Sequence, residues 1–239
     1  KNIVVDRCGF DQYIASLAEK AGTPIKFGHE LKGFKQKDGK YKLFFTNNKE
    51  AEVDYLVGSD GPTSFVARQA GIFGNREILQ GWQSRVEIKD KNQKFEKNVT
   101  DILFGLGEFA WVVPENNRIA RIGIIGKNSP EIKKEYEKLI KPYNVLENQS
   151  GPVPMYNPKQ IMQQDSLALI GDAATQVKAT TYGGIIYGMI SAMYIAERWN
   201  DYEKRFRAKL GKDLWISLKM REVMNKMSEE EASELVKIF

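Results

Sequence analysis

Two short apolar runs that end in glycine and aspartate stand out in the hydrophobic pattern of the chain. Residues 167–170 run into Gly-Asp at 171–172, and residues 54–58 reach Asp-Gly at 60–61. An apolar run of this length bounded by glycine is typical of a strand buried on both faces. Each aspartate therefore follows a strand end, where open α/β sheets bind ligands. Either site alone is also compatible with an ordinary Asp-Gly turn, but the pair predicts a long ligand contacted from two strand ends.

Helical patterns follow both runs. Hydroxyl side chains at 63–64 precede a helix that begins at Phe65, and Gly183-Gly184 precede a strongly apolar helix over 184–199. Serine and threonine are good N-cap residues. A glycine pair before a helix lets a ligand approach the backbone and exposes the amides of the helix N-terminus. We treat the large side chains on this apolar helix as core, namely Tyr187, Met189, Met193 and Tyr194.

The remaining pattern predicts an α/β beginning, an antiparallel middle and a helical end. Apolar and polar residues alternate between Gln80 and Gly126, which is typical of a half-exposed antiparallel sheet. The fold class is therefore α/β, or α+β for the chain as a whole. The other predicted elements are helices over 11–21 and 130–140, strands over 25–35 and 41–46, and helix throughout most of the chain after 199.

Composition narrows the function classes. The 239 residues carry a net charge of +5 from 36 basic and 31 acidic side chains, which suits an anionic cofactor or lipid surface. The basic residues are scattered among acidic ones, so nucleic-acid binding is not indicated. The single cysteine excludes an intramolecular disulfide, and with a single histidine the sequence offers few ligands for a metal site. No apolar run is long enough for a membrane span, and no signal peptide is visible.

Several local patterns together resemble the geranylgeranyl reductase family, whose members are similar to digeranylgeranylglycerophospholipid reductase. This family lies within the FAD flavoproteins similar to p-hydroxybenzoate hydroxylase. Those flavoproteins place a strand-borne Asp-Gly and a later Gly-Asp against FAD. The further matching stretches are Val5-Asp6-Arg7, Phe10-Asp11, Leu17-Ala18, Ala21-Gly22, the run Phe109 to Pro114 with Gly123, and the run from Tyr202 through Glu231.

The resemblance implies an incomplete FAD-binding Rossmann-like domain with an inserted antiparallel substrate domain and C-terminal helices. The expected division is 1–74 and 156–200 for FAD, 75–155 for substrate, and 201–239 for the helices. The family's G-x-G-x-x-G turn, which receives the ADP half of the dinucleotide, does not occur in these residues. The chain also opens at Lys1 without methionine, so we expect the N-terminal ADP-binding segment to be missing.

The resemblance also implies FAD contacts. Arg7 aligns with an arginine that approaches the FAD phosphates, although a surface ion pair is the alternative. Leu31 matches a position whose backbone faces the adenosine, with Asp60 and Gly61 as supporting positions. The flavin half would be contacted by three residues: Asp172 would hydrogen-bond the ribityl chain, and the backbone N–H groups of Gly184 and Ile185 would face the flavin.

Three departures from the family pattern lie near the expected flavin ring: Thr175 replaces arginine, Lys178-Ala179 replaces Asp-Pro, and Tyr182 opens the glycine triplet. For the substrate, the resemblance implies an apolar tunnel lined by Trp111 and Phe109, with Trp82 and Phe104 as weaker candidates. The alternative is that these aromatic side chains only pack against a neighbouring layer.

The function implied is an FAD-dependent oxidoreductase that saturates C=C bonds of geranylgeranyl or other isoprenoid chains in lipids or lipid precursors. Electrons would come from NAD(P)H or ferredoxin. No catalytic residue is assigned; Tyr182 is a proton-donor hypothesis from position alone. Expected partners are the isoprenoid lipid, an electron-donor protein and a chain carrying the missing ADP-binding motif, in a cytoplasmic enzyme peripheral to the membrane. The alternatives are a flavin-dependent aromatic hydroxylase and a non-catalytic or split subunit.

Overall fold

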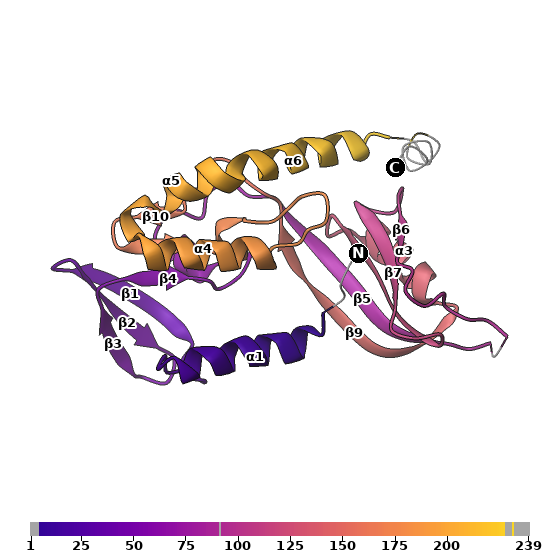
Figure 1. The fold of residues 1–239 in the computed structure, drawn as a ribbon, viewed down its shortest axis with the longest axis horizontal. Helices are drawn as coiled ribbons and strands as arrows, with labels where there is room; N and C mark the ends of the chain where they lie inside the picture. The colour runs from indigo at the N-terminus through magenta and orange to yellow at the C-terminus, as the bar shows by residue number, and fades with distance from the viewer. Residues whose placement is uncertain (1–4, 91, 228–230, 232–239) are drawn as a thin grey trace. The chain divides into compact units, whose positions relative to one another are not determined.

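The computed structural model describes residues 5–90, 92–227 and 231. The chain divides into two compact units, residues 1–55 and 56–239 (Figure 1). The four-part division expected from the sequence stays a prediction. None of the described helices is long and apolar enough to cross a membrane.

The first unit contains one helix and one small antiparallel sheet. Helix α1 begins four residues earlier than predicted, because the Asp6 side chain caps it by accepting a hydrogen bond from the Cys8 N–H at 3.1 Å. The first strand begins at Leu31 rather than Ile25, and Gly28 before it has a φ of +68°, which an extended strand does not allow. The elements are α1 (Arg7–Lys20), β1 (Leu31–Lys37), β2 (Lys40–Phe45) and β3 (Glu50–Val53), in the sheet order β1-β2-β3.

A three-stranded sheet in the second unit contains both apolar runs. Strand β4 (Leu56–Gly58) pairs in parallel with β11 (Leu167–Leu169), and β10 (Gln163–Gln164) completes the order β10-β11-β4. Leu56 lies opposite Leu167, so the two runs are direct neighbours. Helix α2 (Phe65–Gln69) follows β4, and the 3₁₀ helix η1 (Gly171–Ala174) follows β11. The predicted strand ends therefore meet at one edge of the sheet.

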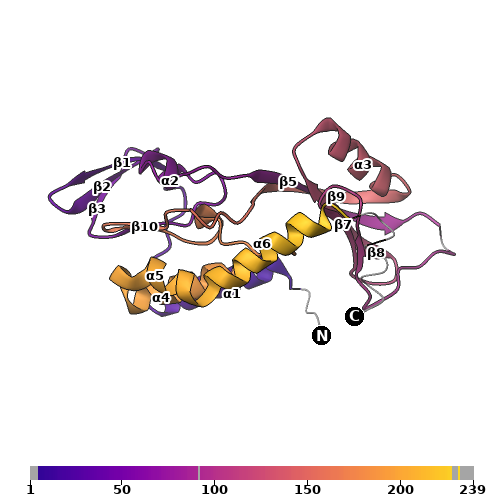
Figure 2. The same cartoon turned by 90° about the horizontal axis from the view of Figure 1, so that it is seen from above.

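A five-stranded antiparallel sheet forms the middle of this unit. Helix α3 (Pro130–Ile140) packs on one face, where Tyr136 contacts Ala110 and Ile124 (Figure 2). The opposite face carries Phe109 and Ile125. The strands are β5 (Ile78–Ile88), β6 (Asp101–Leu103), β7 (Phe109–Pro114), β8 (Ile119–Gly126) and β9 (Tyr143–Pro154), in the order β6-β7-β8-β5-β9. The sheet and α3 confirm the prediction; β9 was not anticipated, because most of its side chains are exposed.

The chain ends in helices, as predicted. These are α4 (Ile185–Glu197), η2 (Trp199–Asp201), α5 (Tyr202–Phe206), the π-helical turn η3 (Arg207–Gly211) and α6 (Lys212–Met224). Residues 228–230 and 232–239 of the predicted helical end lie outside the described residues. The fold class, with α/β, antiparallel and helical parts, is confirmed.

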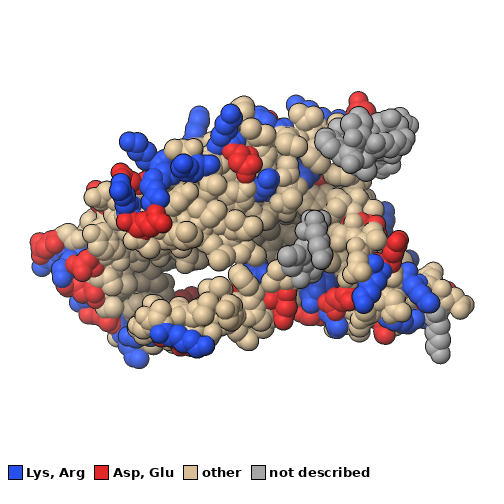
Figure 3. Space-filling model, in the orientation of Figure 1, with Lys and Arg blue, Asp and Glu red and all other residues tan. Residues whose placement is uncertain are grey.

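Helix α4 differs from the sequence-based expectation. Only Ser191 is buried on it, whereas Met189 and Met193 are 46% and 57% exposed. The expectation that these methionines belong to the core is therefore wrong. An almost entirely apolar helix gives no periodic signal, so the sequence could not show which side faces the protein. Figure 3 shows the corresponding surface over α4 without charged side chains.

Candidate functional site

The loop after β4 is held by its own aspartate. Asp60 accepts a hydrogen bond from the Ser64 hydroxyl at 2.6 Å and another from the Val66 N–H at 3.0 Å. Ser64 in turn caps α2 by accepting from the Ala67 N–H at 2.9 Å. Gly61 has a φ of +83°, a conformation that favours glycine. Asp60 thus shapes the loop, and its predicted support of FAD stays a prediction.

Arg76 joins the two strand-end loops. One guanidinium nitrogen, Nη1, donates to the carbonyl of Pro62 at 3.2 Å and to that of Ala173 at 3.1 Å. The guanidinium also lies over the Phe73 ring at 4.0 Å. Burial lowers the pKa of Arg76 to about 10. The side chain fixes the spacing between the Asp60 loop and the Asp172 loop, a role that sequence reasoning missed.

A buried hydrogen-bond network holds the Gly-Asp turn after β11. The Gln176 side-chain oxygen accepts from the Gly171 N–H and from the Ser191 hydroxyl, both at 2.7 Å. Its nitrogen donates to the Tyr202 hydroxyl at 2.6 Å, which donates to the carbonyl of Leu169 at 2.7 Å. Burial raises the pKa of Tyr202 to about 12, so this hydroxyl stays neutral. The turn that carries Asp172 is thereby fixed to both α4 and α5.

The structure places Asp172 against Gly184, with Ile185 next in the chain, and the contact of these residues with FAD stays a prediction. A Cβ atom at Gly184 would lie 2.7 Å from Oδ1 of Asp172, so the carboxylate approaches to a distance that only glycine permits. Ile185 is the first residue of α4, and its N-cap residue, Gly184, has no side chain with which to cap the helix. Its first amides therefore have no intrahelical acceptor. A carboxylate beside uncapped amides can bind a group that offers hydroxyl donors at one end and carbonyl acceptors at the other.

The loop over 178–184 is anchored by α6. Arg221 donates to the carbonyls of Ala179, Thr180 and Glu108 at 3.1, 2.7 and 3.0 Å. The Ser217 hydroxyl accepts from the Thr180 N–H at 2.9 Å. Arg221 is 1% exposed, and this burial lowers its pKa. The guanidinium thus ties the loop before α4 to the loop before β7.

Tyr182 departs from the family pattern in a way that the structure accommodates. Its φ is +52°, and its ring packs on Phe109 with 6.0 Å between centroids and an angle of 22°. Its hydroxyl donates to the Glu108 carboxylate at 3.0 Å. Burial, reinforced by Glu108, raises the pKa of Tyr182 well above its usual value. The phenol hydroxyl therefore already donates its hydrogen bond to the Glu108 carboxylate.

We expect Tyr182→Phe to lower the free energy of unfolding by about 1 kcal/mol, the net worth of one hydrogen bond. Turnover should change less than threefold, on the order of 0.6 kcal/mol in the activation barrier, because the hydroxyl proton already points to Glu108. Steady-state kinetics and thermal unfolding of the same preparation measure both. A large loss of turnover at unchanged FAD content would instead make the phenol a proton donor.

An apolar cavity of about 520 Å³ lies beside the anchored loop. The Trp111 ring lies flat over Gly123, and its Nε1–H donates to the Gln83 side chain at 3.0 Å. Phe109 and Trp111 both line this cavity, and their contact with substrate stays a prediction. The lining residues are Thr100, Ile102, Phe104, Phe109, Trp111, Val113, Thr180, Thr181, Arg221 and Met224.

Trp82 does not belong to this cavity, which corrects the sequence-based expectation. It lies opposite Ile124 on β8 and packs on the face covered by α3. Trp111 lies opposite Gly123, one residue earlier on β8, and so points to the other face. Alternation within one strand gives its two faces, but only the register between strands shows which residues share a face.

Gly123 is predicted to be essential for the shape of this cavity. A Cβ atom there would lie 2.3 Å from the Trp111 ring, so Gly123→Ala must displace the indole. We expect a loss of about 2–3 kcal/mol in unfolding free energy from overpacking. In a Trp111→Ala background the same change should cost less, since the clash with the indole is gone and the contact with the Trp82 carbonyl stays. Urea unfolding of the unchanged protein, the two single variants and the double variant measures this coupling; purely additive losses would contradict the packing.

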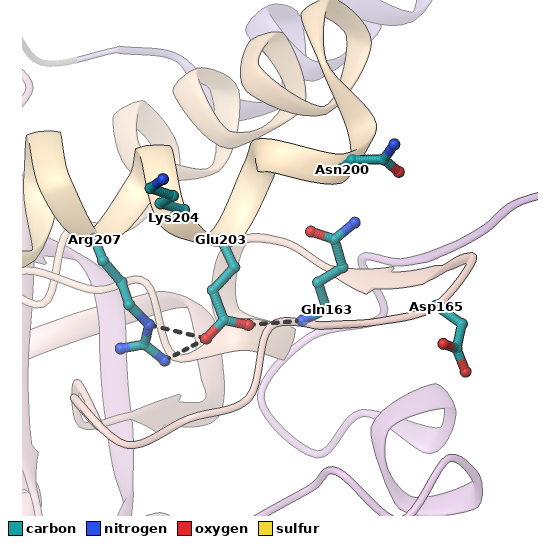
Figure 4. A pocket seen from close by; sticks show the side chains of 6 residues that line it. All are labelled: Gln163, Asp165, Asn200, Glu203, Lys204 and Arg207. Carbon is teal, nitrogen blue, oxygen red and sulfur yellow. Dashed lines mark hydrogen bonds and ion pairs between the residues drawn. The ribbon is translucent and has the colours of Figure 1, made fainter.

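A second, polar pocket of about 610 Å³ lies beside β10 and α5 (Figure 4). Its carboxylate, Glu203, accepts from the N–H groups of Met162 and Gln163 at 2.9 and 3.0 Å. The same carboxylate pairs with Arg207 at 2.7 Å. Arg207 also donates to two backbone carbonyls. Glu203 and Arg207 thus pair with each other and fasten α5 to the segment before β11.

The remaining predicted FAD residues, Arg7 and Leu31, lie in the first unit. Arg7 is at the start of α1 and pairs with Asp11 at 3.2 Å, with both side chains 59% exposed. The surface ion pair considered as an alternative is therefore present. Leu31 is half-buried at the start of β1. Contact of either residue with FAD stays a prediction.

Comparison with known proteins places this chain. Residues 5–146 match the model of the FAD binding domain family. The chain belongs to this family. It is 26% identical over 99% of its length to digeranylgeranylglycerophospholipid reductase 1 of Methanothermobacter thermautotrophicus, and 25% identical over 97% to digeranylgeranylglycerophospholipid reductase of Methanocaldococcus jannaschii. It spans 67% of the length of each.

A solved structure has the same fold. The geranylgeranyl bacteriochlorophyll reductase-like protein of Thermoplasma acidophilum superposes with a TM-score of 0.85 at 24% identity, covering 98% of this chain and 67% of that one. The resemblance stated from the sequence motifs is thus confirmed, as are the FAD cofactor and the oxidoreductase class.

The residues present fit one end of FAD. The close approach of Asp172 to Gly184 leaves a backbone surface that a side chain would fill, and the uncapped start of α4 lies beside it. These groups suit hydroxyl donors and carbonyl acceptors, which the ribityl chain and the flavin ring carry. Among the described residues, no group of three or more histidine, cysteine, aspartate or glutamate side chains could hold a metal ion.

Proposed function

We propose that this chain forms the flavin-side and substrate-side parts of an FAD-dependent reductase that saturates C=C bonds of isoprenoid chains in lipids. The observation that carries the proposal is the position of the apolar cavity. Thr180 and Thr181 line it, and Gly184 follows three residues later at the predicted flavin contact. An apolar chain in the cavity would therefore lie next to the group that reduces it. Relatives named for digeranylgeranylglycerophospholipid reduction support an isoprenoid lipid as substrate.

Within this proposal, each part of the site has a physical role. Asp172 accepts hydrogen bonds from the ribityl hydroxyls, and the α4 amides donate to the flavin. Phe109 and Trp111 hold the isoprenoid chain and exclude water, while Arg221 keeps the loop before α4 in place. FAD, when bound, supplies the hydride for saturation. NAD(P)H or a ferredoxin would supply the electrons, which adds an electron-donor protein to the proposed partners.

The ADP half of FAD needs a further contact. Residues 1–239 contain no G-x-G-x-x-G turn, so we include in the proposal such a turn outside these residues, in the same polypeptide or in a partner. Arg7 and Leu31 are the residues here that would approach this half, and Asp60 and Gly61 stay supporting positions for FAD. Peripheral contact with a membrane is also included, because the proposed substrate is a lipid.

Anaerobic turnover tests this function. The protein is reconstituted with FAD, reduced with dithionite and mixed with detergent-dispersed digeranylgeranylglycerophospholipid. We expect the flavin to be reoxidised without oxygen and the lipid to gain two hydrogen atoms for each saturated bond, measured by absorbance and mass spectrometry. Reoxidation only with oxygen and hydroxylation of a phenol would identify an aromatic hydroxylase. Failure to bind FAD when a G-x-G-x-x-G segment is supplied would identify a non-catalytic subunit.

A further inference from the structure

The outward side of α6 carries an unusual combination of side chains. Leu214, Ser217 and Arg221 are buried on the inner side of the helix. The opposite side exposes Trp215, Ile216, Met220 and Val223, each between 41% and 57% exposed. We call this opposite side the outward α6 face, and we include in it Lys212, Lys219, Lys226 and Met227. Contiguous apolar patches of this kind mark interaction sites.

We propose that the outward α6 face docks the protein onto an anionic lipid surface. The proposal rests on the proposed function, because that function requires access to a lipid. A groove of about 380 Å³ runs along this face, lined by Trp215, Ile216, Lys219, Met220, Val223, Met224 and Met227. An apolar helix face of this kind enters the boundary between lipid headgroups and acyl chains.

The lysines favour a lipid surface that carries negative charge. Lys212 and Lys219 lie seven residues apart on α6 and so share one side of the helix, and Lys226 follows in the turn after the helix. Ile216 and Val223 have the same spacing and form the adjoining apolar row. Lysine stems can lie along an apolar surface while their ammonium groups reach lipid phosphates. Figure 3 shows lysine and arginine side chains gathered over α5 and α6.

Acidic side chains near these lysines are paired, and Glu222 is paired with one of the lysines themselves, which leaves the three lysines in excess over it. Glu222 pairs with Lys219 at 2.7 Å. Asp213 accepts a hydrogen bond from the Tyr187 hydroxyl at 2.6 Å and pairs with Lys178 at 3.6 Å. The net charge of the face is therefore positive. A second copy of the chain docking here would place two sets of lysines against each other, which is unfavourable.

The outward α6 face is also continuous with the substrate cavity. Met224 lines both the groove on α6 and the cavity that contains Trp111. An acyl chain entering the groove from a membrane would thus meet the same side chain that borders the aromatic cavity. This connection commits the proposal to a lipid occupant, since a lipid held at the groove is already next to its binding site.

Vesicle binding tests the proposal. The FAD-loaded protein is sedimented with vesicles made of phosphatidylcholine and about one third phosphatidylglycerol. Phosphatidylglycerol is anionic and attracts lysines. We expect binding to these vesicles and weaker binding to phosphatidylcholine alone. Ile216→Ser/Val223→Ser, and separately Lys212→Gln/Lys219→Gln/Lys226→Gln, should each reduce the partition coefficient about tenfold or more. A blue shift of Trp215 fluorescence, absent in Trp215→Phe, would report insertion.

Matched controls use the same substitutions elsewhere in the second unit. Val145→Ser/Leu146→Ser changes two exposed apolar residues of β9, and Lys133→Gln/Lys134→Gln/Lys138→Gln changes three exposed lysines of α3. Both control variants should bind vesicles like the unchanged protein. Equal binding by all variants, or no binding by the unchanged protein, would overturn the proposal. The proposal would also be overturned if the unchanged protein self-associates and Ile216→Ser/Val223→Ser does not, because a second copy would then cover the face. Vesicle binding that appears only when residues 228–239 are removed would overturn it too, because that segment would then cover the face.

The two proposals fail separately. Ile216 and Val223 do not line the cavity, so Ile216→Ser/Val223→Ser should reduce detergent-dispersed lipid as fast as the unchanged protein. With vesicle-embedded lipid the same variant should be at least about tenfold slower, in line with its partition coefficient. Vesicle binding without any alkene reduction would overturn the proposed function and leave the docking surface intact.

Discussion

Replacing Gln176 by leucine is expected to lower the free energy of unfolding by about 3–4 kcal/mol. Gln176 is fully buried, and its side chain satisfies the Gly171 N–H, the Ser191 hydroxyl and the Tyr202 hydroxyl. Leucine has a similar size but offers no acceptor. The part-buried Gly171 N–H would then lose its partner, at a cost of about 1–3 kcal/mol, and the three further hydrogen bonds, with Ser191, Tyr202 and the Met162 sulfur, would also be lost. Urea unfolding followed by circular dichroism measures the change.

Substitutions of the other network residues should lower the free energy of unfolding by smaller, graded amounts. Ser191→Ala should cost about 1 kcal/mol, because it removes one hydroxyl while Gln176 keeps its other partners. Tyr202→Phe should cost about 2 kcal/mol, because the carbonyl of Leu169 loses its donor. Gln164→Leu is the matched control, since Gln164 is exposed on β10. A loss in Gln164→Leu as large as in Gln176→Leu would show that leucine itself, and not the network, is responsible.

Gln176→Leu should also affect FAD binding, because the network lies next to the predicted FAD contact Asp172. The network fixes the turn that begins at Gly171 and carries Asp172 against α4. If the Gln176→Leu variant still folds, it should therefore also bind FAD less tightly than the unchanged protein. Raising the FAD concentration should restore part of the lost stability, since a ligand that binds only the folded state stabilises it by mass action.

The sequence predicted the parts of the fold whose signal is local. The two apolar runs ending in Gly-Asp and Asp-Gly are strands that pair in parallel, as a shared ligand edge requires. Strand β11 is fully buried as predicted, whereas the prediction of burial on both faces is wrong for β4, which exposes Val57. The alternation between Gln80 and Gly126 is an antiparallel sheet, and Ser129-Pro130 begin the helix that covers it. Each of these patterns depends on neighbours within a few residues.

The parts that could not be predicted depend on contacts far apart in the chain. Arg76 and Ala173 are 97 residues apart, and Arg221 reaches a carbonyl at Glu108 across 113 residues. In the sequence these arginines look like any surface arginine. Trp82 was assigned to the wrong face because its register with β8 is set by pairing and not by its own strand. Strand β9 shows too little apolar alternation to be recognised before its pairing with β5 is known.

Replacing Gly184 by alanine is expected to weaken FAD binding by about 10- to 100-fold, which corresponds to about 1.4–2.8 kcal/mol. The backbone of Gly184 has a φ of −115°, so alanine is not strained there. The added Cβ would lie 2.7 Å from Oδ1 of Asp172, closer than real Cβ contacts allow, so the carboxylate must turn away. A hydrogen bond to a charged acceptor is worth about 1.5–3 kcal/mol, which sets the expected loss. Titration with FAD, followed by flavin fluorescence, measures the dissociation constant.

Two comparisons separate this steric cause from others. At Gly183, an added Cβ would meet only the Thr181 hydroxyl at 3.4 Å, so Gly183→Ala should bind FAD nearly as the unchanged protein does. Asp172→Ala alone should weaken FAD binding as much as Gly184→Ala. Adding Gly184→Ala to Asp172→Ala should then cost little more, because the clashing oxygen is gone. Full additivity of the two changes would mean that Gly184 serves FAD independently of Asp172, whereas unchanged affinity in both single variants would place the flavin elsewhere.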